Sequence, residues 1–179
     1  MKRSGQSLIE TIVAIGMITV AIVAILSVGL SNLMLGGQTS ERVVATNLAR
    51  EGIEIVNAIR NSQRLDPSKS WPYGVETGNW VVDYLDDTDL TLSASDATIS
   101  QCDNCNLYTT GNDVYTRDSG SGNTLTIYRR LINISNGDIL GGNCLNAGDC
   151  EKIITSTVYW MERGRPHIIE LETHLTDWR

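Results

Sequence analysis

Phenylalanine is absent from the 179 residues, and basic side chains are scarce relative to acidic ones. Lysine and arginine number 14 against 21 aspartates and glutamates, which gives a formal net charge of -7. A surface that binds nucleic acid carries clustered positive charge, and no basic stripe is hidden within this acidic total. We therefore expect no nucleic-acid partner.

The sequence also lacks the residue arrangements of common catalytic sites. No Ser/His/Asp or Cys/His arrangement can be placed, no phosphate loop is present, and no paired acids stand in an apolar setting. We therefore expect no catalytic residue, no cofactor and no bound metal, in a protein that is not an enzyme.

Charge is missing from one long stretch near the N-terminus. No charged residue occurs from Thr11 to Ser40, and at about 1.5 Å per helical residue this length exceeds a hydrocarbon core of about 30 Å. Lys2 and Arg3 precede the stretch, so the positive-inside bias places the N-terminus in the cytoplasm and the bulk of the chain outside. A cleaved secretory signal is the competing interpretation, but the apolar run continues to about Leu35 without an Ala-x-Ala exit.

A glycine, a glutamate and the basic start together resemble the type IV prepilin pattern. Gly5 ends a short basic leader, and Glu10 would be the fifth residue of a chain that begins at Gln6. The resemblance implies that a membrane prepilin peptidase cleaves between Gly5 and Gln6 and methylates the new amine of Gln6. The family usually has Phe at this first position, from which Gln6 departs; minor pilins and pseudopilins often vary there.

Glu10 is the one charge near the start of the apolar segment. An ionised group that faces lipid costs about 2.5 to 3.5 kcal/mol at the helix centre on insertion scales, and less near the interface. In the family, a cationic N-terminal amine of a neighbouring subunit pairs with this carboxylate and registers the subunit during assembly. The alternative is a carboxylate that only snorkels to the membrane interface.

The second half of the predicted helix is amphipathic. Two glycines, Gly36 and Gly37, predict a flexible joint in one long helix, although a true break there is the alternative. Asp66-Pro67 ends the pattern, so a helix from Gln6 to about Ser62 is expected, roughly 85 Å long. Beyond the glycines, apolar residues recur at helical spacing: Val44, Leu48, Ile55, Val56 and Ile59.

The remainder predicts a loop-rich antiparallel sheet. Trp80 to Leu85, Thr124 to Ile134, Ile153 to Met161 and His167 to Thr176 favour strands, and residues 162–166 form a hairpin connection with Gly164 available for positive φ. On the last strand one face should lie on the helix, and the other should face water rather than hold zinc. The helix-side residues are Ile169, Leu171, Thr173 and Leu175; the others are Glu170, Glu172 and His174.

The sequence also predicts the surroundings of two arginines and of an acidic stretch. Arg129 and Arg130 are adjacent in a strand and therefore point to opposite faces, one paired and the other solvated. An acidic stretch has no EF-hand spacing, so a solvated loop is favoured over a calcium site. Its members are Asp83, Asp86, Asp87, Asp89 and Asp96.

Four cysteines lie beyond the apolar segment, where the chain is expected to be outside the cytoplasm: Cys102, Cys105, Cys144 and Cys150. Disulfides are the favoured interpretation. No helix or cation is expected beside Cys102-x-x-Cys105 to lower the pKa of a thiol, which argues against a reactive dithiol. Cys144 and Cys150 are further apart than the paired cysteines of a zinc finger usually are, which argues against zinc. Three connectivities are possible. Short loops close at the least entropic cost, which favours Cys102 with Cys105 and Cys144 with Cys150.

Segments at both ends of the chain extend the resemblance to PilV-type minor pilins and the related minor pseudopilins of type II secretion systems. They are residues 48–54, 158–160, 163–165 and 175–179. The resemblance implies an α+β fold in four parts. These are a leader (1–5), a transmembrane or filament-core helix (6–35), an amphipathic soluble half of that helix (36–64) and an antiparallel β head (65–179).

The expected function is that of a minor type IV pilin or pseudopilin in an extracytoplasmic filament, near its tip. Expected partners are other pilin or pseudopilin subunits, prepilin peptidase, the inner-membrane assembly platform and, before assembly, membrane lipid. The expected location is the inner membrane in a single pass, then the pilus or pseudopilus at the cell surface. The alternative is a single-pass anchored extracytoplasmic binding module that uses the loops from Asp83 to Asp118.

Overall fold

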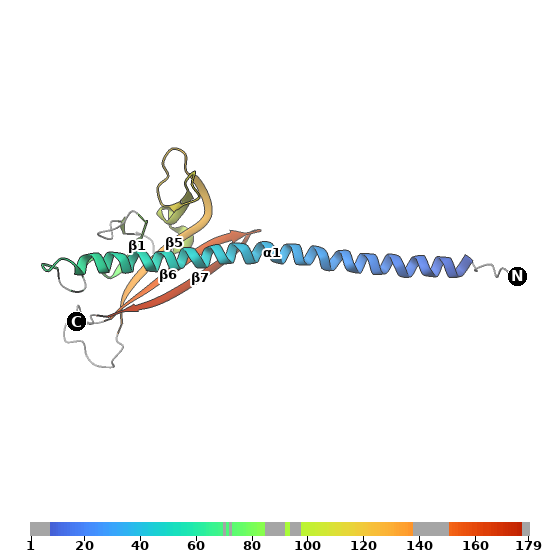
Figure 1. The fold of residues 1–179 in the computed structure, drawn as a ribbon, viewed down its shortest axis with the longest axis horizontal. Helices are drawn as coiled ribbons and strands as arrows, with labels where there is room; N and C mark the ends of the chain where they lie inside the picture. Colours follow the sequence, from blue (N-terminus) through green and yellow to red (C-terminus); the bar gives the residue numbers. More distant parts are fainter. Residues whose placement is uncertain are drawn as a thin grey trace. The chain divides into compact units, whose positions relative to one another are not determined.

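The computed structural model describes residues 8–69, 71, 73–84, 92–93, 98–137 and 151–176, without the side chains of 33–38 and 92–93. The chain divides into two compact units, Met1–Arg42 and Val43–Arg179. Helix α1 (Leu8–Arg64) is in both units, and every strand lies in the second. The described part of the chain thus has an N-terminal apolar helix and an antiparallel sheet, as expected for an α+β protein (Figure 1).

Helix α1 is continuous for 57 residues. The backbone stays helical through Gly36 and Gly37, so the predicted single helix is confirmed and the alternative of a break is wrong. The helix ends two residues later than expected. Leu65 and Asp66 donate their backbone N–H groups to the carbonyls of Ser62 and Gln63, closing a turn before Pro67.

The described strands form one seven-stranded antiparallel sheet. Its longest strand is β5 (Thr124–Gly137), which pairs along one side with β6 and along the other with β1 and β3. Strand β7 pairs with β6, and β2 and β4 pair with β1 and β3. The remaining strand bounds are Gly78–Val81 (β1), Leu92–Ser93 (β2), Asn106–Thr109 (β3), Tyr115–Thr116 (β4), Glu151–Glu162 (β6) and Arg165–Leu175 (β7).

The four predicted strands are present with altered bounds. Strand β1 begins at Gly78 and ends at Val81, so the expected continuation toward Leu85 is wrong. The β6–β7 connection has two residues, Arg163 (φ 49°) and Gly164 (φ 77°), where five were expected. Positive φ at both positions is the backbone twist that a two-residue hairpin requires. Pro166 therefore lies inside β7, where it is tolerated because the described sheet ends at this strand.

One stripe of α1 packs on one face of the sheet, which we call the inner face (Figure 1). Leu48, Val56 and Ile59 are buried as the periodicity predicted, and Val44 packs against the same core. The prediction for β7 is also confirmed, since Ile169 and Leu171 contact the part of the core around Leu48. Leu175 belongs to the part around Val56 and Ile59.

Gly52 lets the helix and sheet approach closely. A Cβ added at Gly52 would lie 2.8 Å from Ile132 Cδ1 and 2.9 Å from Ser156 Oγ, closer than real Cβ contacts allow. This glycine costs the helix about 1 kcal/mol of intrinsic propensity, and the packing of α1 on β5 and β6 explains why it stands in the middle of the helix.

Arg129 and Arg130 point to opposite faces as predicted, but neither is simply solvated. Arg130 is 1% exposed and donates to the carbonyl oxygens of Leu48 (3.1 Å) and Val82 (2.9 Å). Its guanidinium lies 3.5 Å from Glu51, so it links α1 to the segment after β1. Arg129 donates to Asn106 Oδ1 at 2.9 Å, so the expectation that one of the two arginines is left to water is wrong.

The opposite, outer face of the sheet has its own small core. Cys102 and Cys105 are joined by a disulfide, and two 3₁₀ turns, η1 (Ile99–Gln101) and η2 (Asp103–Cys105), form this region. Both half-cystines are buried with Ile99 and Leu131. The favoured pairing of Cys102 with Cys105 is therefore present. The pairing of Cys144 with Cys150 lies outside the described residues.

Candidate functional site

The first described part of α1 is a segment suited to lipid. Leu8–Asn32 spans 25 residues with a mean hydropathy of 2.7, and none of it is buried within the protein. A helix of this length rises about 37 Å, which is enough to cross a hydrocarbon core of about 30 Å. The side chains are exposed all around the helix rather than along one stripe. By length and composition, this one helix is able to cross a membrane.

Three of the four hydroxyl groups in this segment are hydrogen-bonded within the helix. Thr11 donates to the carbonyl of Leu8 and Thr19 to that of Gly16, both at 2.8 Å, and Ser31 donates to the carbonyl of Ser27 at 3.0 Å. Such local bonds are what a lipid environment demands, because hydrocarbon offers polar groups no partner. The three hydroxyl groups are thus compatible with a lipid-facing surface.

Glu10 is the charged residue of the segment and lies in its first turn. A carboxylate is stabilised near a helix N-terminus by the unpaired N–H groups and the helix dipole. That effect is modest and does not replace a counter-ion in hydrocarbon. The predicted cleavage and methylation positions, Gly5 and Gln6, lie outside the described residues.

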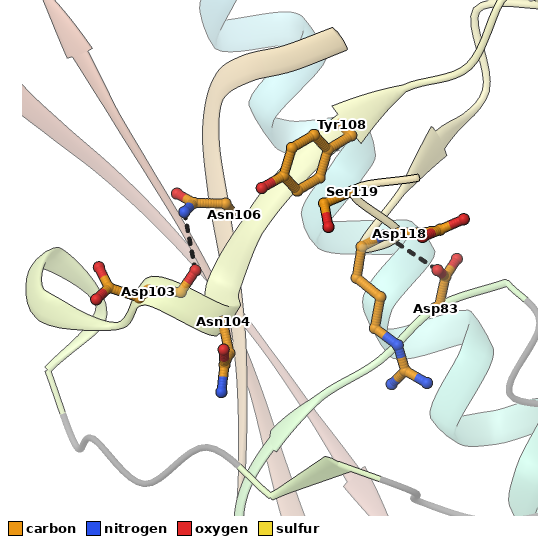
Figure 2. A pocket seen from close by; sticks show the side chains of 8 residues that line it. Asp83, Asp103, Asn104, Asn106, Tyr108, Asp118 and Ser119 are labelled. Carbon is orange, nitrogen blue, oxygen red and sulfur yellow. Dashed lines mark hydrogen bonds between the residues drawn. The ribbon is translucent and has the colours of Figure 1, made fainter. Parts of the chain in front are cut away.

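A second candidate is an open polar pocket in the head, with a volume of about 410 Å³. It lies beside η2 and β3 and the connection from β4 to β5 (Figure 2). Figure 2 shows the carboxylates of Asp103 and Asp118 pointing in opposite directions, so the polar groups do not converge on one point. Its lining comprises Asp83, Asp103, Asn104, Asn106, Tyr108, Arg117, Asp118 and Ser119.

Asp83 corrects one expectation from the sequence. It is 2% exposed rather than part of a solvated acidic loop. Its Oδ2 accepts hydrogen bonds from Thr116 Oγ1 at 2.6 Å and from the Arg117 N–H at 3.0 Å, while Oδ1 accepts from the Tyr84 N–H at 2.7 Å. This carboxylate therefore fixes the end of β4 against the segment after β1. The other acidic residues, Asp86, Asp87, Asp89 and Asp96, lie outside the described residues.

The histidines are held by carboxylates. His174 Nδ1 is hydrogen-bonded to the buried Glu151, and its Nε2 lies 3.2 Å from Glu172. The bond with Glu151 raises the pKa of His174 above its ordinary value, and desolvation opposes the rise. His167 stacks on Trp160 with ring centroids 5.2 Å apart, and its Nε2 lies 3.6 Å from Glu162. Within the described ranges, no group of three or more His, Cys, Asp or Glu residues is placed to hold a metal ion.

The chain was compared with models of known protein families, with curated proteins and with solved structures, and it matches none of them.

Proposed function

We propose that this chain is a minor type IV pilin or pseudopilin, a structural subunit that prepilin peptidase processes and that joins an extracytoplasmic filament. The observation that carries the proposal is a 25-residue apolar helix segment with a carboxylate in its first turn, continuous with a helix half that packs on a β head. A plain membrane anchor needs no such carboxylate.

In this proposal the apolar segment has two successive environments. Lipid surrounds Leu8–Asn32 first, with the N-terminus in the cytoplasm and the head outside. Neighbouring subunits surround it after assembly. Its uniform exposure fits both environments, because each contacts the helix on all sides. Glu10 pairs with the N-terminal amine of a neighbour and so provides the register of assembly.

The mature N-terminus tests the proposal. The full chain is co-expressed with a prepilin peptidase, and its intact mass and N-terminal peptide are measured. We expect Gln6 as the first residue, with the loss of Lys2 and Arg3 moving the formal side-chain charge from -7 to -9. A Gly5→Val variant should keep Met1, because a bulky side chain replaces the glycine at the cleavage position. An uncleaved wild-type chain would contradict the proposal.

The polar pocket supports one alternative, a single-pass anchored binding module outside the cytoplasm. Its volume is within the range of small-molecule sites, about 300–1,000 Å³. However, the inward-facing carboxylate of Asp83 is already bound by three donors of the protein itself. An intact Met1 together with membrane integration would favour this alternative over a filament subunit.

A further inference from the structure

The β6–β7 hairpin ends in an exposed apolar surface on the outer face of the sheet. Met161 and Pro166 are cross-strand partners. Tyr159 and Ile168, two residues further from the turn, form the next pair on the same face. Met161 is 44% exposed and Ile168 is 55% exposed. Large apolar side chains gathered at one place mark an interaction surface more often than scattered single residues do.

Two arginines stand at the tip of this hairpin. Arg163 and Arg165 are both exposed, and Glu162 is the one acidic residue in the sequence from Tyr159 to Ile169. The tip is therefore locally positive although the whole chain has a net charge of -7. At physiological salt, charges more than about 8 Å away are largely screened, so the local sign decides what this tip attracts. Arginines next to apolar side chains match an anionic lipid surface, where the cations contact head groups and the apolar groups enter the interface.

The hairpin end lies at the part of the head where α1 enters it. Trp160, the neighbour of Met161, packs with Ala45 and Leu48, the first buried residues of the helix in this unit. Only ten residues separate Asn32, the end of the apolar segment, from Val43, the start of the second unit. Those residues reach about 16 Å as a helix and about 40 Å if fully extended. This end of the head is thus tethered within a short distance of any bilayer that holds the apolar segment.

We propose that the β6–β7 hairpin end, defined by Met161, Arg163, Arg165, Pro166 and Ile168, docks on an anionic lipid surface while the subunit is anchored in the membrane. The inference depends on the membrane anchoring in the proposed function and adds a second lipid contact to it. Docking holds the head against the bilayer before assembly, with only the hairpin end in the interface; Glu170 and Glu172, further along the same face of β7, stay in water.

Oxidation of Met161 measures whether this surface is covered. Met161 is the only methionine beyond Met34. Its side chain is partly exposed, and its sulfur accepts a hydrogen bond from the Tyr159 hydroxyl at 2.9 Å. Dilute hydrogen peroxide in water converts such a thioether to the sulfoxide. The full chain is reconstituted in vesicles of phosphatidylcholine alone or mixed with phosphatidylglycerol, and peptide mass spectrometry follows the sulfoxide. We expect oxidation of Met161 to be at least about threefold slower in the anionic vesicles, since insertion excludes the aqueous oxidant.

Leu65→Met supplies a matched control in the same chain. Leu65 is 85% exposed and follows the C-terminal end of α1, about 33 Å along the helix from Val43. The methionine introduced at position 65 should oxidise at the same rate in both vesicles. Replacing both Arg163 and Arg165 with alanine should remove the slowing at Met161 while leaving the fold intact, because both side chains are exposed.

Three results overturn the inference. The first is equal oxidation of Met161 in neutral and anionic vesicles. The second is protection that increases with protein density whatever the lipid charge, which would assign the surface to a second copy of the chain. The third is extraction of the chain by alkaline washing, which would refute the membrane anchoring as well. A chain that resists extraction but shows no protection refutes only the docking.

Discussion

The two halves of helix α1 share one backbone geometry and differ in what surrounds them. From Leu8 to Asn32 every side chain is exposed, and apolar residues occupy all sides. From Ala45 to Ile59 one stripe is buried on the sheet, and charged residues such as Arg50 and Glu54 face water. The first half is long and apolar enough to cross a membrane and packs on nothing within the described part of the chain, whereas the second half packs on the chain's own sheet.

This difference explains where polar groups are tolerated. In the apolar half, the hydroxyl groups of Thr11, Thr19 and Ser31 donate to carbonyl oxygens of the helix itself. In the head, a buried charge is kept by partners from other elements, as Arg130 is by Leu48 and Val82. Glu10 is a charged residue in the apolar half, where the described residues give it no such buried partner from another element. In the proposed function, the N-terminal amine of a neighbouring subunit supplies the partner.

The largest expected effect comes from removing the buried guanidinium that holds the second half of α1. Arg130→Ala should lower the free energy of unfolding of the head by about 3 to 5 kcal/mol, since it breaks a buried charged network and leaves a cavity. Denaturant unfolding in detergent, followed by tryptophan fluorescence, measures this, because all four tryptophans lie beyond residue 70. Arg165→Ala, an exposed arginine of β7, is the control and should change stability by less than about 0.5 kcal/mol. Equal stability of the two variants would contradict this account of Arg130.

A pair of glycine substitutions compares the two halves directly. Gly52→Leu should destabilise the head by about 1 to 3 kcal/mol, because its side chain overlaps Ile132 and Ser156. Gly29→Leu in the apolar half meets nothing within 4 Å and should leave head unfolding unchanged. The same fluorescence measurement applies to both variants. A stable Gly52→Leu head would show that the helix does not approach the sheet as closely as described.

The smallest effect is a dependence of head stability on pH through His174. Hydrogen bonding with Glu151 raises its pKa above the ordinary value of about 6.5. A group whose pKa is raised by folding stabilises the protein fully below the unfolded pKa, and this contribution is lost as the pH rises through the folded pKa. His174→Gln should therefore lower the melting temperature of the head at about pH 6 and have a smaller effect at about pH 9. A difference that stays constant over this range would contradict the role of the imidazolium.

Periodicity in the sequence predicted much of the fold, for physical reasons that are local. The 3.6-residue spacing of Leu48, Val56 and Ile59 requires a buried helix stripe, and the period of two in β7 assigns Ile169 and Leu171 to the core. Gly164 indicated the hairpin because glycine readily adopts positive φ. Arg163 also adopts positive φ, which its residue type does not indicate in the sequence. The predicted connection of five residues was therefore longer than the observed one of two.

The tertiary roles of individual polar residues were not predictable from the sequence. Asp83 belongs to an acidic run, and only the approach of Thr116 and Arg117, more than 30 residues away, makes it a buried acceptor. Arg129 is bound by Asn106, which is brought near by the pairing of β3 with β5. For the candidate site, the length of the apolar segment and the position of Glu10 follow from the sequence alone. The pocket, in contrast, depends on loops whose arrangement has no periodic signal.

Incorporation of a Glu10→Ala subunit tests the central claim most directly. Removing a carboxylate from the apolar segment does not hinder membrane insertion, so the variant should integrate and be processed as the wild type is. If Glu10 pairs with the N-terminal amine of a neighbour, the variant should be lost from sheared filaments while remaining in the membrane, as quantified by immunoblotting of the two fractions. Thr11→Ala, which removes a hydroxyl already satisfied within the helix, is the control and should be incorporated normally. Equal amounts of Glu10→Ala and wild-type subunit in the filament fraction would contradict the account.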